Sequence, residues 1–375
     1  METETNKKDY RICARCIMDT SDPDIIFDEE GVCNHCHYFD TAVKPKWFPN
    51  DQGKEMLLTI VEQIRNEGAK QEYDSILGLS GGADSSYLAY QTKKLGLRPL
   101  VVHVDAGWNS ELAQNNIENI VKILGFELFT YVVDWEEMLD LQVAFLRSGL
   151  ANQDIPQDHA FVAKLYEFAV KNKIKYVLSG GNYATESILP LSWAYYNTDL
   201  KHLKSIHKIF GKRRLKTFPT VNYFKSFIYY PRVKGMKVIT PLNYMPYDRK
   251  EAIKLLEHEL KWKDYGKKHY ESRFTKFFQG FFLPMKFGYD KRRAHLSSMI
   301  LSGQMTRDAA LLEMEHEVYS PSQAREDMVF VAKKLGLTYE EFDVLLHLPN
   351  TTYKDYPSNK WLFEFTRELM RLLKS

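Results

Sequence analysis

The sequence predicts an α/β protein with a doubly wound parallel sheet, an N-terminal zinc ribbon and a C-terminal helical region. Three observations predict this arrangement. Short apolar segments alternate with helical segments through the middle of the chain, as they do in parallel sheets. All four cysteines lie within the first 36 residues. The last quarter contains clear helix-start signals. We place the domain boundaries at residues 1–48, 49–245 and 246–375.

Composition narrows the class of protein. Of the 375 residues, 44% are hydrophobic and 27% charged, which is ordinary for a globular protein. No apolar run approaches the roughly 18 residues of a membrane span, and the N-terminus lacks the apolar stretch of a secretory signal. We therefore expect a cytoplasmic protein without a membrane partner. A net charge of +2 is too small to argue for a nucleic-acid partner.

The N-terminal cysteines form two CxxC pairs, and the residues between them include an expected short strand at 25–27. Two such pairs at this separation are typical of a tetrahedral zinc site with four thiolates, Cys13, Cys16, Cys33 and Cys36. A closed site of this kind is structural. The alternatives are disulfides or free thiols, of which a reducing compartment disfavours the disulfides, and an iron–sulfur cluster. His35 and His37 lie beside the last cysteine and could replace a thiolate.

A glycine turn follows the first expected strand, at residues 74–79, and precedes an expected helix at 87–95. Glycines let the backbone approach phosphate oxygens, and a helix N-terminus offers free N–H groups. Asp84 is placed to hold Mg²⁺. The candidate ATP-binding residues here are Ser80, Gly81, Gly82, Asp84, Ser85 and Ser86.

The string SGGADS resembles the signature of the PP-loop (N-type) ATP pyrophosphatases, which have a HUP-like fold. No lysine follows the glycines, so the loop is not a Walker motif. The resemblance implies that the loop grips the β,γ-pyrophosphate of ATP. It also implies adenylation of a substrate at the α-phosphorus, with release of AMP and pyrophosphate.

Further strands are expected at residues 99–104, 126–133 and 176–178, with helices at 109–124 and 154–171. Ligands of such sheets bind beyond the carboxyl ends of the strands. Polar candidates at those ends are Asp105, Asp134, Ser179, Gly180 and Asn182. In PP-loop enzymes the end of the second strand holds the adenosine, which by resemblance indicates Val104 and Asp105. Asp105 and Asp134 could instead be turn or helix-cap residues.

Two basic segments occur in the second half of the chain. Residues 201–216 contain no acid and read as a solvated helix face, with Leu203, Ile206, Ile209 and Phe210 turned inward. Three functional alternatives are that this segment forms a docking surface for a partner, that it binds an acidic substrate, or that it binds RNA. Residues 286–295 contain five cations, and a helix is expected at 292–300. PP-loop synthetases bring a downstream cation over the leaving pyrophosphate, and by that resemblance the catalytic candidates are Lys286, Arg292 and Arg293.

The order of the motifs resembles the N-acetyl sugar amidotransferase family of the WbpG/PseA type, from about residue 12 to about residue 315. The motifs are CARCIMDTSDPDIIFDEEGVCNHC, SGGADSSY, HVDAGWNSE, LSGGNYATES and KFGYDKRRAHLSSMILSGQMTRDAA. The resemblance implies an ATP-dependent C–N ligase that converts the acetamido group of a nucleotide-linked acidic sugar to acetamidino, through an adenylated imidate. The pathways are those of lipopolysaccharide O-antigen and flagellin sugars. Glu186 is a candidate acid/base for nitrogen transfer, or else an ion-pair or surface residue.

The nitrogen source follows from the cysteines. A glutaminase needs a nucleophilic cysteine, and the zinc ribbon claims all four. We therefore expect a separate glutaminase that supplies ammonia. The resemblance implies a HisH-like glutaminase, with a HisF-like cyclase-type subunit as a further partner.

Two other functions remain open at this point. One is a tRNA-modifying PP-loop enzyme, favoured by the ribbon and the basic stretch and disfavoured by the near-neutral charge. The other is a non-catalytic ATP-binding module, disfavoured by Asp84 and the downstream cations.

Overall fold

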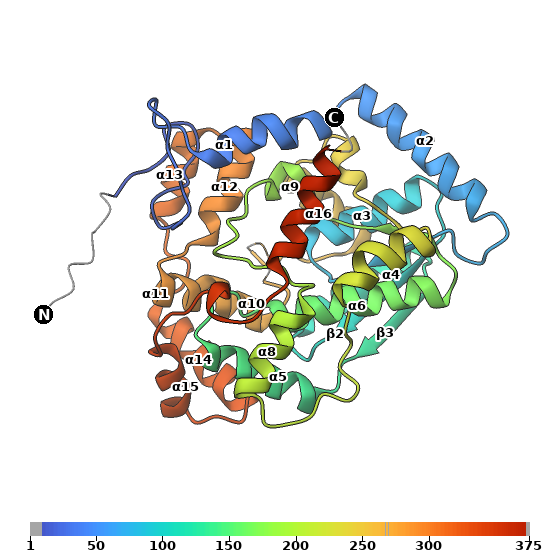
Figure 1. Ribbon diagram of the computed structural model, residues 1–375. Coiled ribbons are helices and arrows are strands. Elements are labelled where there is room, and N and C mark those ends of the chain that lie inside the picture. The colour runs from blue at the N-terminus through green and yellow to red at the C-terminus, as the bar shows by residue number, and fades with distance from the viewer. Residues whose placement is uncertain (1–9, 267, 269, 373–375) are drawn as a thin grey trace, which may run out of the picture.

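A five-stranded parallel sheet forms the centre of the computed structural model, which describes residues 10–266, 268 and 270–372 (Figure 1). The strand order is β3-β2-β1-β4-β5, and every neighbouring pair is parallel. The bounds are β1 Ser75–Gly78, β2 Pro99–Asp105, β3 Leu128–Val132, β4 Tyr176–Leu178 and β5 Lys237–Ile239. The first four are the expected strands, whereas β5 was not expected.

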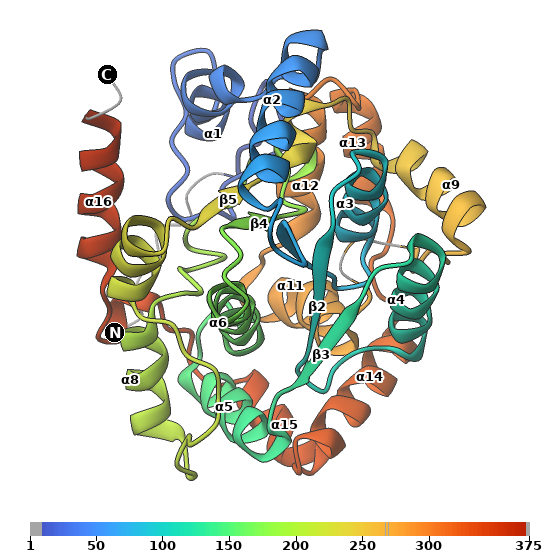
Figure 2. The ribbon, with the colours of Figure 1, turned by 90° about the vertical axis from the view of Figure 1, so that its right-hand side faces the viewer.

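Helices cover both faces of this sheet, which confirms the doubly wound prediction (Figure 2). One face packs against α5 (Trp135–Ser148) and α6 (Ile155–Lys171). The opposite face packs against α2 (Asp51–Glu67), α3 (Ala83–Lys94), α4 (Glu111–Leu124) and α9 (Arg249–Leu260). Strands β1, β2 and β4 read as continuous apolar runs because they are buried on both sides.

The predicted helical C-terminal region is confirmed. Its helices are α10 (Arg273–Phe277), α11 (Leu283–Phe287), α12 (Lys291–Leu301), α13 (Arg307–Glu315), α14 (Pro321–Lys334), α15 (Tyr339–Leu346) and α16 (Lys360–Leu372). Thr338 and Glu341 form the expected capping box of α15. Phe274 and Phe278 join the same apolar core as α5 and α6. Helices α10, α14 and α15 are therefore built onto that face of the sheet.

The remaining elements are short or irregular. They are α1 (Asn34–Tyr38), α7 (Tyr183–Glu186), α8 (Leu200–Phe210), three π-helical turns at Phe39–Val43, Lys225–Val233 and Phe278–Phe282, and 3₁₀ turns at Lys44–Lys46, Pro241–Tyr244 and Tyr353–Asp355. In α8, Leu203 and Ile206 are buried as expected, but Ile209 is exposed, so its inward placement was wrong. No helix within the described residues is long and apolar enough to cross a membrane.

The N-terminal segment packs against α12 and α13, far away in the sequence (Figure 1). Arg293 pairs with the buried Asp19 at 2.9 Å, and Arg307 donates to the backbone carbonyl oxygens of Cys13 and Cys16. The strand expected at residues 25–27 was wrong, because this stretch makes only one isolated bridge, between Phe27 and Cys33. A ribbon this small is held by its cysteines and by α12 rather than by a sheet.

Candidate functional site

The candidate site lies at the point where the strand order reverses, between β1 and β4. Strands β1 and β4 are neighbours, but β2 and β3 extend to one side and β5 to the other. Ligands of open α/β sheets bind at this switch point. The glycine loop follows β1, and residues 179–181 follow β4. A Cβ on Gly180 would lie 3.1 Å from the backbone nitrogen of Ser85, so the two loops are in direct contact.

The glycine loop has a turn conformation that requires glycine. Gly81 has a φ of +86°, in the left-handed region that favours glycine. Its carbonyl oxygen accepts hydrogen bonds from Trp262 Nε1 at 2.8 Å and from the Tyr265 hydroxyl at 3.0 Å. Gly82 is the N-cap of α3, and no side chain caps that helix. The first turn of α3 therefore presents its positive end to an anion.

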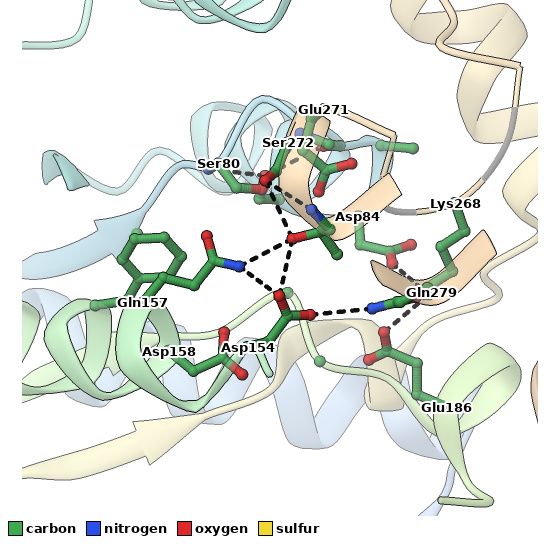
Figure 3. A pocket seen from close by; sticks show the side chains of 18 of the residues that line it. Ser80, Asp84, Asp154, Gln157, Asp158, Glu186, Lys268, Glu271, Ser272 and Gln279 are labelled. Atoms are coloured by element: carbon green, nitrogen blue, oxygen red, sulfur yellow. Dashed lines mark hydrogen bonds and ion pairs between the residues drawn. The ribbon is translucent and has the colours of Figure 1, made fainter. Parts of the chain in front are cut away.

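A cavity of about 600 Å³ opens beside this loop (Figure 3). Seven of the residues expected at the site line it: Ser80, Gly82, Asp84, Ser85, Val104, Gly180 and Glu186. Four others are not among its described lining residues: Gly81, Ser86, Asp105 and Asn182. Asp105 accepts from the backbone of Gly107, and Asn182 caps α7, so both act as turn or cap residues. Asp134 caps α5 in the same way.

Lys268 joins two carboxylates that line the cavity, Asp84 and Glu186. Its Nζ lies 2.7 Å from Asp84 Oδ2 and 2.9 Å from Glu186 Oε1 (Figure 3). Burial works to lower the pKa of Lys268, but the charges of Asp84 and Glu186 outweigh it and raise the pKa to about 12. The Tyr247 hydroxyl also donates to Asp84. Lys268 is therefore a fixed cation beside the expected phosphates.

A second polar group lies across the cavity, on the first turn of α6. The Asp154 carboxylate accepts hydrogen bonds from Gln157 Nε2, Thr275 Oγ1 and Gln279 Nε2, at 2.5, 3.2 and 3.3 Å (Figure 3). Burial raises the pKa of Asp154, and burial together with the charge of Asp154 raises the pKa of Asp158 to about 7. Asp158 can therefore exchange a proton near neutral pH.

Helix α12 brings two further ionisable side chains into the cavity, Lys291 and His295. Burial lowers the pKa of Lys291 against the opposing charges of Asp154, Asp158 and Glu186. Burial, with the charge of Lys268, lowers the pKa of His295 to about 3, so this ring is neutral at pH 7.

Part of the cavity lining is apolar. Val102 and Val104 of β2 face Phe161, Val162 and Leu165 of α6 across it. A slot between a strand end and a helix, with apolar walls and open backbone groups, suits a flat heterocycle such as adenine.

The three cations expected to cover the pyrophosphate lie elsewhere. Lys286 donates to the carbonyl oxygens of Leu346 and Leu348, Arg292 pairs with Asp290 at 2.7 Å, and Arg293 holds the N-terminal segment through Asp19. None of the three is among the described residues that line the cavity. Lys268, in contrast, lines the cavity and lies beside the glycine loop, so we move the assignment to Lys268.

Sequence reasoning missed most of the charged lining. Asp154 and Asp158 are four residues apart on one helix, as are Lys291 and His295, and this spacing places each pair on one helix face. That spacing was a usable signal. Lys268 had none, because it comes from an irregular connection that reaches Asp84 only through the tertiary fold.

The four cysteine sulfurs lie together at the N-terminus. All four are buried, and their Sγ atoms lie within 4.8 Å of one another. The Sγ separations are 3.8 Å for Cys13–Cys36, 3.6 Å for Cys16–Cys33 and 3.7 Å for Cys33–Cys36. Tetrahedral zinc with bonds of about 2.3 Å requires sulfurs about 3.8 Å apart. The cluster therefore fits a zinc ion, and four sulfurs leave no position for a substrate.

Comparison with known proteins supports part of this description. Residues 271–370 match a family model described as "LPS biosynthesis protein WbpG-like, C-terminal domain". The tRNA(Ile)-lysidine synthase of Chlamydia pneumoniae is 33% identical over 93 residues, which are 24% of this chain and 27% of that protein. The chain thus matches about a quarter of the length of this curated relative.

Three solved structures are also similar. They are a predicted subunit of tRNA methyltransferase from Methanocaldococcus jannaschii (21% identity, TM-score 0.27, 48% of this chain and 74% of that one), the NH3-dependent NAD synthetase of Campylobacter jejuni (15%, 0.29, 55% and 84%) and the NMN synthetase of Francisella tularensis (17%, 0.28, 56% and 86%). The resemblance drawn from the sequence is confirmed in two respects. The C-terminal part is WbpG-like, and the chain shares a segment with a tRNA(Ile)-lysidine synthase.

Proposed function

Because residues 271–370 form a WbpG-like domain, we propose that the chain is an ATP-dependent synthetase of lipopolysaccharide sugar biosynthesis. Its substrate is a nucleotide-linked acidic sugar with an acetamido group. The reaction consumes ATP and ammonia and yields an acetamidino sugar, AMP and pyrophosphate. The nitrogen comes from a separate glutaminase.

The main observation behind this proposal is that one cavity contains both a phosphate-binding loop and buried carboxyl groups. The glycine loop and Lys268 lie on one side, and the carboxyl groups of Asp154 and Asp158 lie on the other. The reaction begins with a neutral amide and ends with a cationic amidinium. Buried carboxylates stabilise positive charge as it develops, just as Lys268 stabilises negative charge on phosphates. Lys291 supplies a cation for the carboxylate of an acidic sugar.

The first step activates the acetamido oxygen. This oxygen attacks the α-phosphorus of ATP, a bond forms between them, and the bond to the β-phosphate breaks to release pyrophosphate. The N-terminus of α3, the Ser80 and Ser85 hydroxyls and Lys268 hold the phosphates. Asp84 and Glu186 are the carboxylates beside Lys268, and as oxygen ligands they fit Mg²⁺, which would neutralise phosphate charge.

The second step replaces the oxygen. Ammonia attacks the imidate carbon, and AMP leaves with the former amide oxygen as the C–O bond breaks. The attacking nitrogen must lose a proton, and Asp158 is suited to accept it because its pKa is about 7. Asp154 then faces the amidinium product.

An assay of the purified chain tests this proposal. Mg-ATP, ammonium and a panel of UDP- and CMP-linked N-acetylated acidic sugars are incubated with it, while pyrophosphate and product mass are followed. We expect a product lighter by the difference between O and NH, with pyrophosphate in equal amount. An acceptor panel that yields neither signal would contradict the proposal.

A second candidate is a tRNA-modifying enzyme with the same ATP chemistry. The segment after α8 favours it, since the side chains of Lys212, Arg213 and Arg214 are exposed next to one another. A gel shift with bulk tRNA at physiological salt separates the two. Binding that weakens steeply with salt and responds to charge reversal of these residues would favour tRNA.

A further inference from the structure

Helix α16, at the edge of the molecule, presents an exposed apolar stripe (Figure 2). Trp361, Phe365 and Leu369 are 64%, 61% and 44% exposed. Because they are spaced four residues apart, these side chains lie along one face of the helix. Phe363 points to the opposite side and is buried against Tyr196, with 4.6 Å between the ring centroids. The stripe therefore faces away from the body of the molecule.

The segment that supports α16 also exposes large apolar side chains. Tyr223 and Phe227 each pack against Phe363, with 5.4 Å between ring centroids. The residues that follow them, Phe224 and Ile228, are 56% and 43% exposed. Single exposed apolar residues are normal on a protein surface, whereas a group of them on adjoining elements indicates an interaction site.

The chain beside this apolar surface is strongly basic. Residues 200–247 contain eleven Lys and Arg residues and no Asp or Glu. Lys201 and Lys204 are exposed on the first turns of α8. This part of α8 lies next to the start of α16, since the Ser205 hydroxyl donates to the backbone carbonyl oxygen of Pro357 at 3.2 Å.

Cations also outnumber acids among the residues that flank the stripe. Lys225 is exposed directly after Phe224, and Arg367 is exposed on α16. Of the two acids on α16, Glu364 is paired with Lys360 at 3.3 Å, and Glu368 is exposed. Together with the first turns of α8, this surface has a net positive charge.

An anionic bilayer surface fits this combination of features. Trp, Phe and Leu side chains on the outer face of a helix enter the boundary between headgroups and acyl chains, and neighbouring cations attract anionic lipids. RNA would pair with the cations but would leave Ile228 and Leu369 without a partner, because RNA is bound through base stacking and polar edges. A second copy of the chain would bring like charges together.

We propose that the outer face of α16, together with Phe224 and Ile228, binds the surface of a membrane that contains anionic lipids. This inference does not depend on the proposed function, because none of these residues is among the described residues that line the first cavity. Peripheral binding needs no spanning helix. The proposal therefore departs from the expectation of a chain without a membrane partner, which was drawn from the lack of spanning and signal segments.

Sedimentation of the full chain with lipid vesicles tests this proposal. The vesicles consist of phosphatidylcholine alone, or of phosphatidylcholine and phosphatidylglycerol in equal amounts. We expect the wild type to sediment only with the second kind, and added salt to weaken the binding. Trp361→Glu/Phe365→Glu should lower the partition coefficient at least about tenfold, because two apolar side chains no longer leave water. Lys201→Glu/Lys204→Glu should lower it about tenfold through charge alone.

Leu312→Glu is the matched control, since it makes the same kind of change at a similarly exposed position, 59%, on α13, and it should bind like the wild type. Thermal unfolding shows whether each variant is folded, and the lysine variant still tests the surface if the α16 variant does not fold. Wild-type protein that stays in solution with both kinds of vesicle would overturn the proposal. So would an α16 variant that binds vesicles like the wild type but has lost a wild-type dimer or a tRNA complex.

Discussion

Lys268 is the residue on which the ATP half of the site depends. Its ammonium group lies within 3 Å of two carboxylates beside the glycine loop, whereas the ammonium group of Lys286 is held by backbone carbonyl oxygens. We expect Lys268→Met to lower kcat/KM for ATP by about 100-fold or more, because a cation at the leaving pyrophosphate is lost. Pyrophosphate release measured over a range of ATP concentrations checks this.

Lys286→Met is the informative comparison. Its ammonium binds two backbone carbonyl oxygens next to α15, so the loss should appear in the melting temperature and leave the KM for ATP unchanged. If Lys286→Met lost ATP turnover and Lys268→Met did not, the assignment predicted from the sequence would be restored.

The raised pKa that makes Asp158 a suitable base should also lower the stability of the folded chain near neutral pH. The unfolded pKa of an aspartate is about 3.9, and in the folded chain burial and Asp154 raise that of Asp158 to about 7. The folded state then binds more protons between these values, so stability falls as pH rises from about 4 to 7. Asp158→Asn removes this loss. We expect it to be more stable than the wild type by about 1–3 kcal/mol at pH 8 and equal at pH 4, since one pKa unit is about 1.4 kcal/mol and the group is partly solvated.

Thermal unfolding at both pH values measures this difference, with Glu257→Gln, an exposed position on α9, as the control. The same Asp158→Asn protein should lose amidine formation. A melting temperature that falls at pH 8 would show that the Asp158 carboxylate stabilises the fold, contrary to this account.

Helix α12 is the element that links the N-terminal cysteine cluster to the site. Lys291 and His295 face the cavity, while Arg293 and Ser297 hold the N-terminal segment. Loss of the ribbon fold should therefore disturb both the N-terminal segment and the cavity. We expect Cys13→Ser to lose the bound zinc, about one ion per chain in the wild type, to lower the melting temperature and to reduce amidation. Metal analysis and activity on the same preparation check this, and full activity in zinc-free protein would contradict the coupling.

The elements predicted correctly from the sequence are those whose conformation is determined by residues close together in the chain. The glycine loop and strands β1, β2 and β4 were found because buried parallel strands are short apolar runs, and the turn needs Gly81 at positive φ. Strand β5 was missed because it has three residues, two of them exposed. The cations were misplaced because nothing local distinguishes Lys268, which meets Asp84 through the fold, from Lys286.

For the whole molecule, the source of nitrogen is the main prediction. All four cysteines lie in the ribbon cluster, so the chain has no thiol for a glutaminase reaction. We expect ammonium, and not glutamine, to support turnover by the pure chain. Addition of a glutaminase should restore the use of glutamine. Glutamine-dependent product from the pure chain, with ammonia release excluded in a heat-inactivated control, would refute the expected division of labour.

The central claim is that the acetamido oxygen is transferred to AMP. The most direct measurement uses an acceptor sugar labelled with oxygen-18 in the acetamido carbonyl, incubated with the chain, Mg-ATP and ammonium. The account predicts that the heavy oxygen appears in AMP and that the amidino product is free of it. Unlabelled AMP formed alongside amidino product would contradict an adenylated imidate, and with it the role assigned to the glycine loop.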